Sequence, residues 1–148
     1  MTATPRRILL VNGPNLNLLG VREPETYGTH TLEDVVALAT QTAARLDLEV
    51  RHVQSNHEGV LIDAIHAARL DCLGVVINPG GFTHTSVALR DALTGVALPV
   101  IEVHLSNIHW RESFRHHSFV PGIAEVVVCG AGIHGYAFGV EHLARHHA

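Results

Sequence analysis

Five segments of the chain have the hydrophobic pattern of β-strands. Residues 8–11, 74–77 and 125–129 are almost continuously apolar, residues 99–103 carry one acid among apolar neighbours, and residues 48–53 alternate apolar and polar. Short runs of this kind, rich in Val, Ile and Leu, are typical of strands within a sheet. The pattern therefore predicts five strands.

The stretches between these segments have helical patterns. Residues 31–34 (Thr-Leu-Glu-Asp) match a capping box, and after them apolar residues recur three and four positions apart to about Leu46. Residues 55–58 match a second capping box, which opens a helix to about Leu70. Further helices are predicted from about 85 to 93, with an end near Gly95, as one turn over 111–115, and from about 135 to 146.

The alternation of strands and helices predicts one α/β domain over residues 1–148. Such alternation gives a parallel sheet with helices on both faces. With right-handed crossovers, five strands favour a flavodoxin-like three-layer fold with the sheet order 2-1-3-4-5. In that order a ligand binds beyond the carboxyl ends of the strands, where the first and third strands lie side by side.

Three loops at that edge of the sheet hold unusual residues. The first, Asn12–Gly28, is far longer than the about 2–6 residues that usually join a strand to a helix. The second, Asn78–His84, follows the third predicted strand, and the third loop, His104–Arg115, follows the fourth. Because parallel strands end at the same edge, we expect the three loops to form one site.

Composition excludes several classes of function. The net charge is −4 and no basic stripe is present, so nucleic acid is not an expected partner. All ten basic residues are arginine, so the chain has neither the amine of a Schiff-base enzyme nor the lysine of a phosphate-binding P-loop. No apolar run approaches the roughly 20 residues of a membrane helix, and no signal peptide is present. We therefore expect no membrane partner and a cytoplasmic location.

Tyr27 is the candidate base of the first loop. It lies among polar and glycine residues, whereas Tyr136 lies at helical spacing with apolar residues and is predicted to pack in the core. A free phenol has a pKa of about 10 and is hardly ionised at pH 7. A guanidinium group nearby favours the ionised form. Arg22 in the same loop, and Arg111 or Arg115 across the cleft, are placed to supply that charge.

His104 is the candidate acid. It ends the fourth predicted strand two residues after Glu102, so both side chains are expected on the same side of that strand. A carboxylate there holds the imidazole in one tautomer and favours its charged form. The pair is therefore suited to donate a proton to a leaving group.

The other loop residues suit a small polar ligand. Asn78-Pro-Gly-Gly exposes backbone without bulky side chains, which allows a ligand to approach closely. Asn78, His84 and Ser106 suit a hydroxylated substrate better than an apolar one. The backbone amides of Leu105 and Ser106 are placed to bind a carboxylate with the help of an arginine. The glycine spacing of dinucleotide-binding proteins is absent.

Thirteen histidines raise the question of a metal. His142 and His146 lie four apart on the last predicted helix, but no histidine pair has the Glu of the zincin motif, and we expect no metal ion.

Two alternatives to an enzyme of this kind stay open. A flavodoxin-like binding module would need an acidic phosphorylation pocket or a flavin site, and a metal hydrolase would lose activity with a chelator.

Four motifs together resemble type II 3-dehydroquinate dehydratase, from about Ile8 to Leu143. Each is moderately specific, and their order and spacing are very specific. They are Asn12-Gly-Pro-Asn-Leu-Asn-Leu-Leu-Gly with Arg22 and Tyr27, Gln54-Ser-Asn-His-Glu-Gly59, Ile77-Asn-Pro-Gly-Gly with Thr83-His-Thr-Ser86, and Glu102-Val-His-Leu-Ser-Asn107 with Arg111 and Arg115.

The resemblance implies a lyase of the shikimate pathway, which leads to chorismate and the aromatic amino acids. Such an enzyme removes water from 3-dehydroquinate by anti elimination through an enolate, without cofactor, metal or imine. Tyr27 would be the base, Asn15 would stabilise the enolate through a water, and His104 would be the acid. The other implied residues are Arg22 and Arg111, which keep the base ionised, Glu102 behind the acid, and Asn78, His84, Leu105, Ser106 and Arg115, which hold the substrate.

The resemblance also implies an assembly of trimers into a dodecamer. Asp91 would reach the site of a neighbouring subunit in it. The apolar content of 47 % and the mean hydropathy of +0.20 are consistent with surfaces that other copies cover. Val60, Ala64 and Ala131 depart from the family pattern, which has an acid, a tryptophan and a leucine there. The first two lie on the second predicted helix, so we expect them to affect subunit contacts rather than catalysis.

Overall fold

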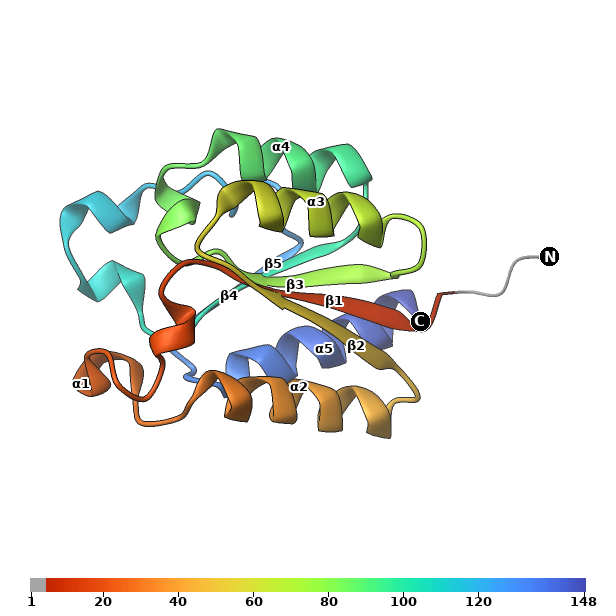
Figure 1. Ribbon diagram of the computed structural model, residues 1–148, viewed down its shortest axis with the longest axis horizontal. Coiled ribbons are helices and arrows are strands. Elements are labelled where there is room, and N and C mark those ends of the chain that lie inside the picture. Colours follow the sequence, from red (N-terminus) through yellow and green to blue (C-terminus); the bar gives the residue numbers. More distant parts are fainter. Residues whose placement is uncertain (1–4) are drawn as a thin grey trace.

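A five-stranded parallel sheet forms the centre of the computed structural model, which describes residues 5–148 (Figure 1). The strand order is β2-β1-β3-β4-β5 and every pairing is parallel, so the predicted flavodoxin-like order is confirmed. A single domain over 1–148 stays a prediction, and residues 1–4 lie outside the described part of the chain. The strands are β1 (Arg7–Asn12), β2 (Glu49–Gln54), β3 (Gly74–Asn78), β4 (Val100–His104) and β5 (Val126–Cys129).

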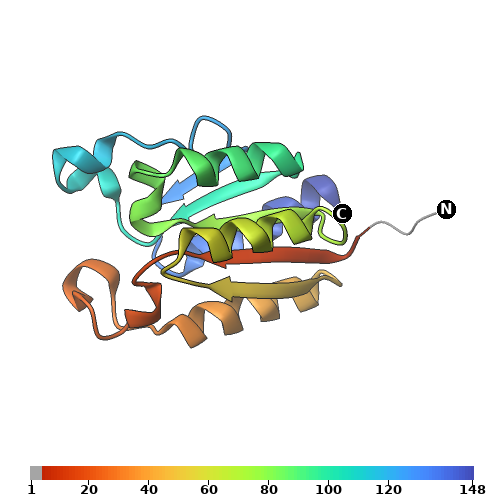
Figure 2. The same ribbon diagram turned by 45° about the horizontal axis from the view of Figure 1, so that its top comes forward.

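Helices cover both faces of the sheet. α2 (Leu32–Arg45) and α5 (His134–His147) lie on one face, and α3 (Glu58–Ala68) and α4 (Val87–Val96) lie on the other (Figures 1 and 2). The short helix α1 (Pro24–Tyr27) lies in the long loop after β1. Within residues 5–148 no helix has the length and apolar content needed to cross a membrane.

The strand side chains alternate between two apolar cores, one on each face of the sheet. In β1, Ile8 and Leu10 belong to the core under α2 and α5, whereas Leu9 and Val11 belong to the core under α3 and α4. All four side chains are at most 1 % exposed. Burial on both faces explains why this strand is a continuous apolar run in the sequence.

The capping boxes show one correct and one wrong prediction. At the start of α2, the amide of Asp34 donates to Thr31 Oγ1 and the amide of Thr31 donates to Asp34 Oδ2, so the first box is confirmed. The second box is wrong, because α3 begins at Glu58 after His57. Ser55 Oγ instead accepts from the amide of His57 at 2.9 Å, since a serine hydroxyl readily closes a local turn with the backbone two residues on.

Two other helix boundaries differ from the prediction. α4 begins at Val87 because Ser86 is its N-cap, with Oγ accepting from the amide of Leu89 at 2.9 Å. The helix ends at Val96, near Gly95 as predicted, and the next residue, Ala97, is in the left-handed region at φ 56°. The single turn predicted over 111–115 is a 3₁₀ helix at Ser113–His116, and 3₁₀ helices also form at Leu16–Leu18, Gly80–His84 and Ile108–Trp110.

Two glycines one turn apart let α5 pack closely on the sheet. A Cβ atom on Gly135 would lie 2.9 Å from Val103 Cγ1, and one on Gly139 would lie 3.2 Å from Ile101 Cγ2. Any larger residue would push the helix away from β4. The glycines therefore fix the position of α5, which carries Tyr136 toward the carboxyl edge of the sheet.

We expect Gly135→Ala to lower the free energy of unfolding by about 1–3 kcal/mol, because the added methyl group must displace Val103 in a packed core. Gly59→Ala is the matched control. A Cβ atom there meets nothing within 4 Å, and alanine favours a helix over glycine by roughly 0.5–1 kcal/mol. Urea unfolding measures both variants, and equal effects would contradict the packing argument.

Candidate active site

The loops after β1, β3 and β4 enclose a cavity of about 130 Å³ at the carboxyl edge of the sheet. This is where the strand order placed the site. Glu102 lies behind His104 rather than on the cavity wall, and Asp91 lies on the exposed face of α4, away from the cavity. The other ten residues predicted for the site all line the cavity: Asn15, Arg22, Tyr27, Asn78, His84, His104, Leu105, Ser106, Arg111 and Arg115.

A glycine allows the loops after β1 and β3 to touch. The amide of Gly13 donates to the carbonyl of Asn78 at 2.8 Å. A Cβ atom on Gly13 would lie 2.7 Å from the carbonyl carbon of Pro79, so no other residue permits this approach. Two residues on, Asn15 has φ 69°, and its backbone amide donates to Asn56 Oδ1 at 3.0 Å. Asn15 is thus held against the cavity by the loop after β2.

Tyr27 ends α1 with two guanidinium groups against its ring. Cζ of Arg22 lies 4.9 Å from the ring centroid, and Cζ of Arg111 lies 5.1 Å from it. Arg22 comes from the loop after β1 and Arg111 from the loop after β4. Two loops far apart in the sequence therefore bring positive charge to one phenol, as the sequence predicted.

Glu112 orients the arginines of the third loop, and sequence reasoning missed it. Its Oε2 accepts from Arg115 Nε at 2.7 Å and lies 3.9 Å from Arg111 Nε. Hydrogen bonds from its own backbone amide and from Arg115 hold the pKa of this carboxyl below its usual range. Glu112 lies three residues before Arg115, and this spacing within one helical turn could have predicted the ion pair from the sequence.

Glu102 is fully buried and holds His104. Glu102 Oε2 lies 2.7 Å from His104 Nε2 and accepts from Thr83 Oγ1 at 2.7 Å. Because Nε2 of His104 faces the carboxylate, Nδ1 is the ring nitrogen left for the cavity. Glu102 Oε1 has no hydrogen-bond partner among residues 5–148. Thr83 had no predicted role, since no periodicity distinguishes a loop threonine that bonds to a strand residue.

The hydrogen bonds of His84 define its tautomer. Burial lowers the pKa of His84, which favours the neutral ring over the charged one. Nδ1 lies 2.8 Å from the carbonyl of His117, which can only accept, so Nδ1 carries the hydrogen. Nε2 is then free to accept a hydrogen bond from a hydroxyl group.

A buried hydrogen-bond network supports the site from beneath. The hydroxyl of Tyr136 donates to Asn12 Oδ1 at 2.6 Å and accepts from Asn78 Nδ2 at 2.9 Å. Asn78 Oδ1 accepts from the amide of Gly80 at 3.1 Å, which fixes the orientation of the Asn78 amide. Tyr136 is fully buried, as predicted for a packing residue, and burial raises its pKa. Its hydroxyl contact with the site was not predicted, because helical spacing reports only which face is buried.

The chain is similar to known proteins over most of its length. Residues 6–144 match the family model described as dehydroquinase class II. A catabolic 3-dehydroquinase of Pyricularia oryzae is 61 % identical over 93 % of this chain and 89 % of that protein. A 3-dehydroquinate dehydratase of Corynebacterium glutamicum is 63 % identical over 95 % of this chain and 97 % of that protein. The crystal structure of type II dehydroquinase from Propionibacterium acnes superposes with a TM-score of 0.91 at 41 % identity, covering 97 % of this chain and 99 % of that one.

We expect Tyr136→Phe to lower the free energy of unfolding by about 1–3 kcal/mol, because it leaves Asn12 Oδ1 and Asn78 Nδ2 buried without this partner. Tyr27→Phe is the matched control. Across residues 5–148 the hydroxyl of Tyr27 makes no hydrogen bond, so the same change there should stay within about 0.5 kcal/mol. Urea unfolding compares the two, and equal destabilisation would show that the network contributes nothing.

Proposed function

The chain belongs to the class II dehydroquinase family, and on that premise we propose that it removes water from 3-dehydroquinate to give 3-dehydroshikimate, a hydro-lyase reaction of the shikimate pathway. The observation that carries the proposal is one cavity that combines a phenol beside two guanidinium groups with an imidazole beside a buried carboxylate. The first pair suits a base and the second suits an acid. An elimination of water needs both.

We assign the first proton transfer to Tyr27. As a phenolate, it takes the proton from the carbon next to the ketone. A free phenol with a pKa of about 10 is only about 0.1 % ionised at pH 7. Positive charge near a phenol favours its ionised form, and the position of Arg22 and Arg111 against the Tyr27 ring supports this role.

Loss of that proton places negative charge on the ketone oxygen of the substrate. Donors already aimed at this charge lower the barrier, because they need no reorganisation during the reaction. We assign this role to Asn15, acting through a water. Two observations support a fixed position of Asn15 on the cavity wall: its strained backbone at φ 69° and the hydrogen bond from its backbone amide to Asn56 Oδ1.

The second transfer is assigned to His104. Its proton goes to the departing hydroxyl group, the carbon–oxygen bond breaks, and water leaves. As this bond breaks, the electron pair of the enolate forms the new carbon–carbon double bond, and the ketone conjugated with it is restored. The negative charge of Glu102, buried 2.7 Å away, stabilises the charged imidazole before the transfer. His104 Nδ1 is the donor in this scheme.

The remaining cavity residues are assigned to substrate binding. Asn78 and the neutral His84 suit the hydroxyl groups, and Leu105 and Ser106 suit the carboxylate through their backbone amides. Arg115 adds charge for the same carboxylate, and its ion pair with Glu112 supports a fixed orientation.

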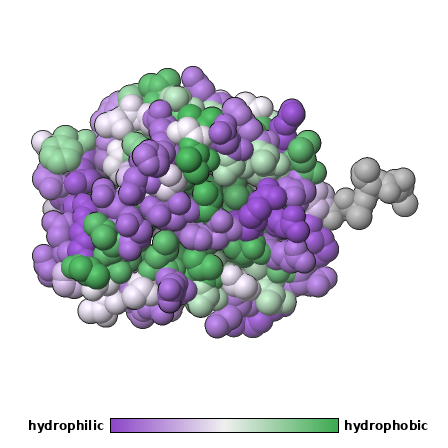
Figure 3. Space-filling model, viewed as in Figure 1, coloured by the Kyte–Doolittle hydropathy of each residue, from purple (hydrophilic) through white to green (hydrophobic). Residues whose placement is uncertain are grey.

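We also propose the assembly of trimers into a dodecamer, and a cytoplasmic location. Large apolar side chains at the loops of the site support the assembly, since Val21, Trp110 and Phe114 are 82 %, 88 % and 65 % exposed. Apolar patches also lie among polar residues on the face drawn in Figure 3. The exposed position of Asp91 is consistent with contact to the site of a neighbouring subunit, and Val60 is similarly exposed on α3.

The function is tested by adding purified protein to 3-dehydroquinate and recording the ultraviolet absorbance of the conjugated enone product. A rising absorbance that follows enzyme concentration is the expected result. Failure to form the enone, with substrate bound and protein folded, would reject the proposed reaction.

We expect Tyr27→Phe to lower kcat by about 10²–10⁴-fold, because positioned general bases typically contribute that much. Substrate binding should change little, since the ring remains between its neighbours. Thr26→Val is the matched control, because it removes the hydroxyl of the residue before Tyr27 in α1. Thr26 does not line the cavity, so kcat should stay within about twofold. Near-normal turnover in Tyr27→Phe would exclude it as the base.

We expect Glu102→Gln to lower kcat by about tenfold or more, because general acids typically contribute about 10²–10⁴ and this variant removes the charge that stabilises the acid. KM should change little, because Glu102 does not line the cavity. Thr83→Val is the control, since it removes one hydrogen bond to Glu102 but leaves the charge. Steady-state kinetics separates them, and equal losses would indicate a purely structural role for Glu102.

A further inference from the structure

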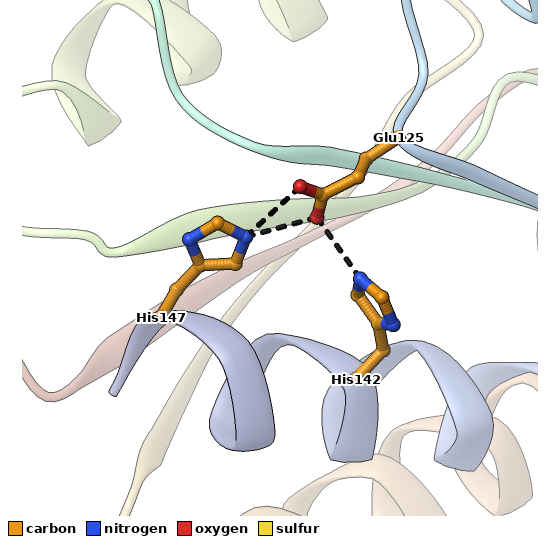
Figure 4. Close-up of side chains that lie close together, drawn as sticks. All are labelled: Glu125, His142 and His147. Atoms are coloured by element: carbon orange, nitrogen blue, oxygen red, sulfur yellow. Dashed lines mark hydrogen bonds and ion pairs between the residues drawn. The ribbon is translucent and has the colours of Figure 1, made fainter.

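Glu125, His142 and His147 form a cluster that the proposed reaction does not use (Figure 4). Glu125 directly precedes β5, at the amino edge of the sheet, and the histidines lie in the last turns of α5. The end of α5 and the loops of the cavity lie at opposite ends of the molecule in Figure 1. The cluster is therefore separate from the candidate active site.

The three side chains point their ligand atoms at one another. His142 Nε2 lies 3.0 Å from Glu125 Oε2, and His147 Nε2 lies 2.9 Å from the same oxygen and 3.2 Å from Oε1. All three ligand atoms lie within 4.8 Å of one another. Zinc bonds of about 2.0–2.2 Å in a tetrahedral site place neighbouring ligand atoms roughly 3.3–3.6 Å apart. The Glu125–histidine distances are slightly shorter than this and all pairs lie within 4.8 Å, so small rotations of the three side chains would make room for an ion.

The backbones that carry these ligands are fixed. The amide of Glu125 donates to the carbonyl of Val100 at 2.7 Å, which ties it to the start of β4. Leu143, next to His142, is fully buried in the core under α5. The side chains themselves remain reachable, with exposed fractions of 42 % for Glu125, 27 % for His142 and 28 % for His147.

The chemistry of the donors selects a class of metal. Glu125 offers a carboxylate oxygen, and His142 and His147 each offer an imidazole nitrogen. Two imidazole nitrogens and one carboxylate suit Zn²⁺, Co²⁺ or Ni²⁺, whereas Mg²⁺ and Ca²⁺ prefer oxygen alone. The sequence pattern had singled out His142 and His146, but the carboxylate selects His142 and His147 instead.

We propose that Glu125, His142 and His147 bind one zinc-class divalent ion, with water completing its coordination. The ion joins the start of β5 to the end of α5 and so fastens the last helix to the sheet. A ligand that binds only the folded state stabilises it by mass action. The site is structural, and dehydration of 3-dehydroquinate does not depend on it.

The test is calorimetric titration of the full chain, with any purification tag removed, with ZnCl₂. We expect one ion per chain, a higher thermal unfolding midpoint with Zn²⁺, and no binding of MgCl₂. Glu125→Gln and His142→Ala should each weaken Zn²⁺ binding tenfold or more and abolish the thermal shift. His146→Ala is the matched control and should bind as the wild type, because His146 makes no bond to Glu125.

Binding of several weak ions that Glu125→Gln leaves unchanged would overturn the proposal, because scattered surface histidines among the thirteen then account for it. Equal losses in His142→Ala and His146→Ala, or no binding at all, would also overturn it. Enone formation from 3-dehydroquinate should be equal in all these variants. That assay confirms that they fold and keeps a failure of the metal site distinct from a failure of the proposed function.

Discussion

The role proposed for Tyr27 depends on positive charge held beside a phenol, and here two separate loops must meet to hold that charge. Arg22 and Arg111 are 89 positions apart in the sequence, yet both lie against Tyr27. They meet because β1 and β4 end at the same edge of a parallel sheet. The order of the strands is therefore a requirement of the electrostatics and not only of packing.

Close packing fixes the positions of the strands, and through them the residues of the site. The central strands β1, β3 and β4 are buried on both faces, so a slip of one residue would exchange the side chains of the two cores and disrupt the packing of both. Gly13 and Gly135 then permit two close approaches, one between loops and one between a helix and the sheet. Through the second, α5 delivers the hydroxyl of Tyr136 to Asn78, so a helix on the back of the sheet orients a residue on the cavity wall.

The sequence was sufficient for the features that repeat locally or follow from topology. Periodicity predicted the strands and the main helices, and the sheet order placed the three loops together. The misses share a cause. Tyr136 and Asn12 are 124 positions apart, and His147 and Glu125 are 22 apart, so no local pattern links them. The capping box predicted at Ser55 was wrong for the opposite reason. The same local sequence allows the Ser55 hydroxyl to accept from the backbone amide of Glu58 or from that of His57, and the structure has the second.

Glu102 Oε1, buried without a hydrogen-bond partner among the described residues, has a consequence for adaptation to heat. An unsatisfied buried polar atom typically costs a protein about 1–3 kcal/mol. A selection for thermal tolerance alone would favour an uncharged or apolar residue at this position, which under the role proposed for Glu102 would give stable but slow enzymes. Ancestral or engineered thermostable relatives that remain active must instead gain their stability elsewhere in the chain.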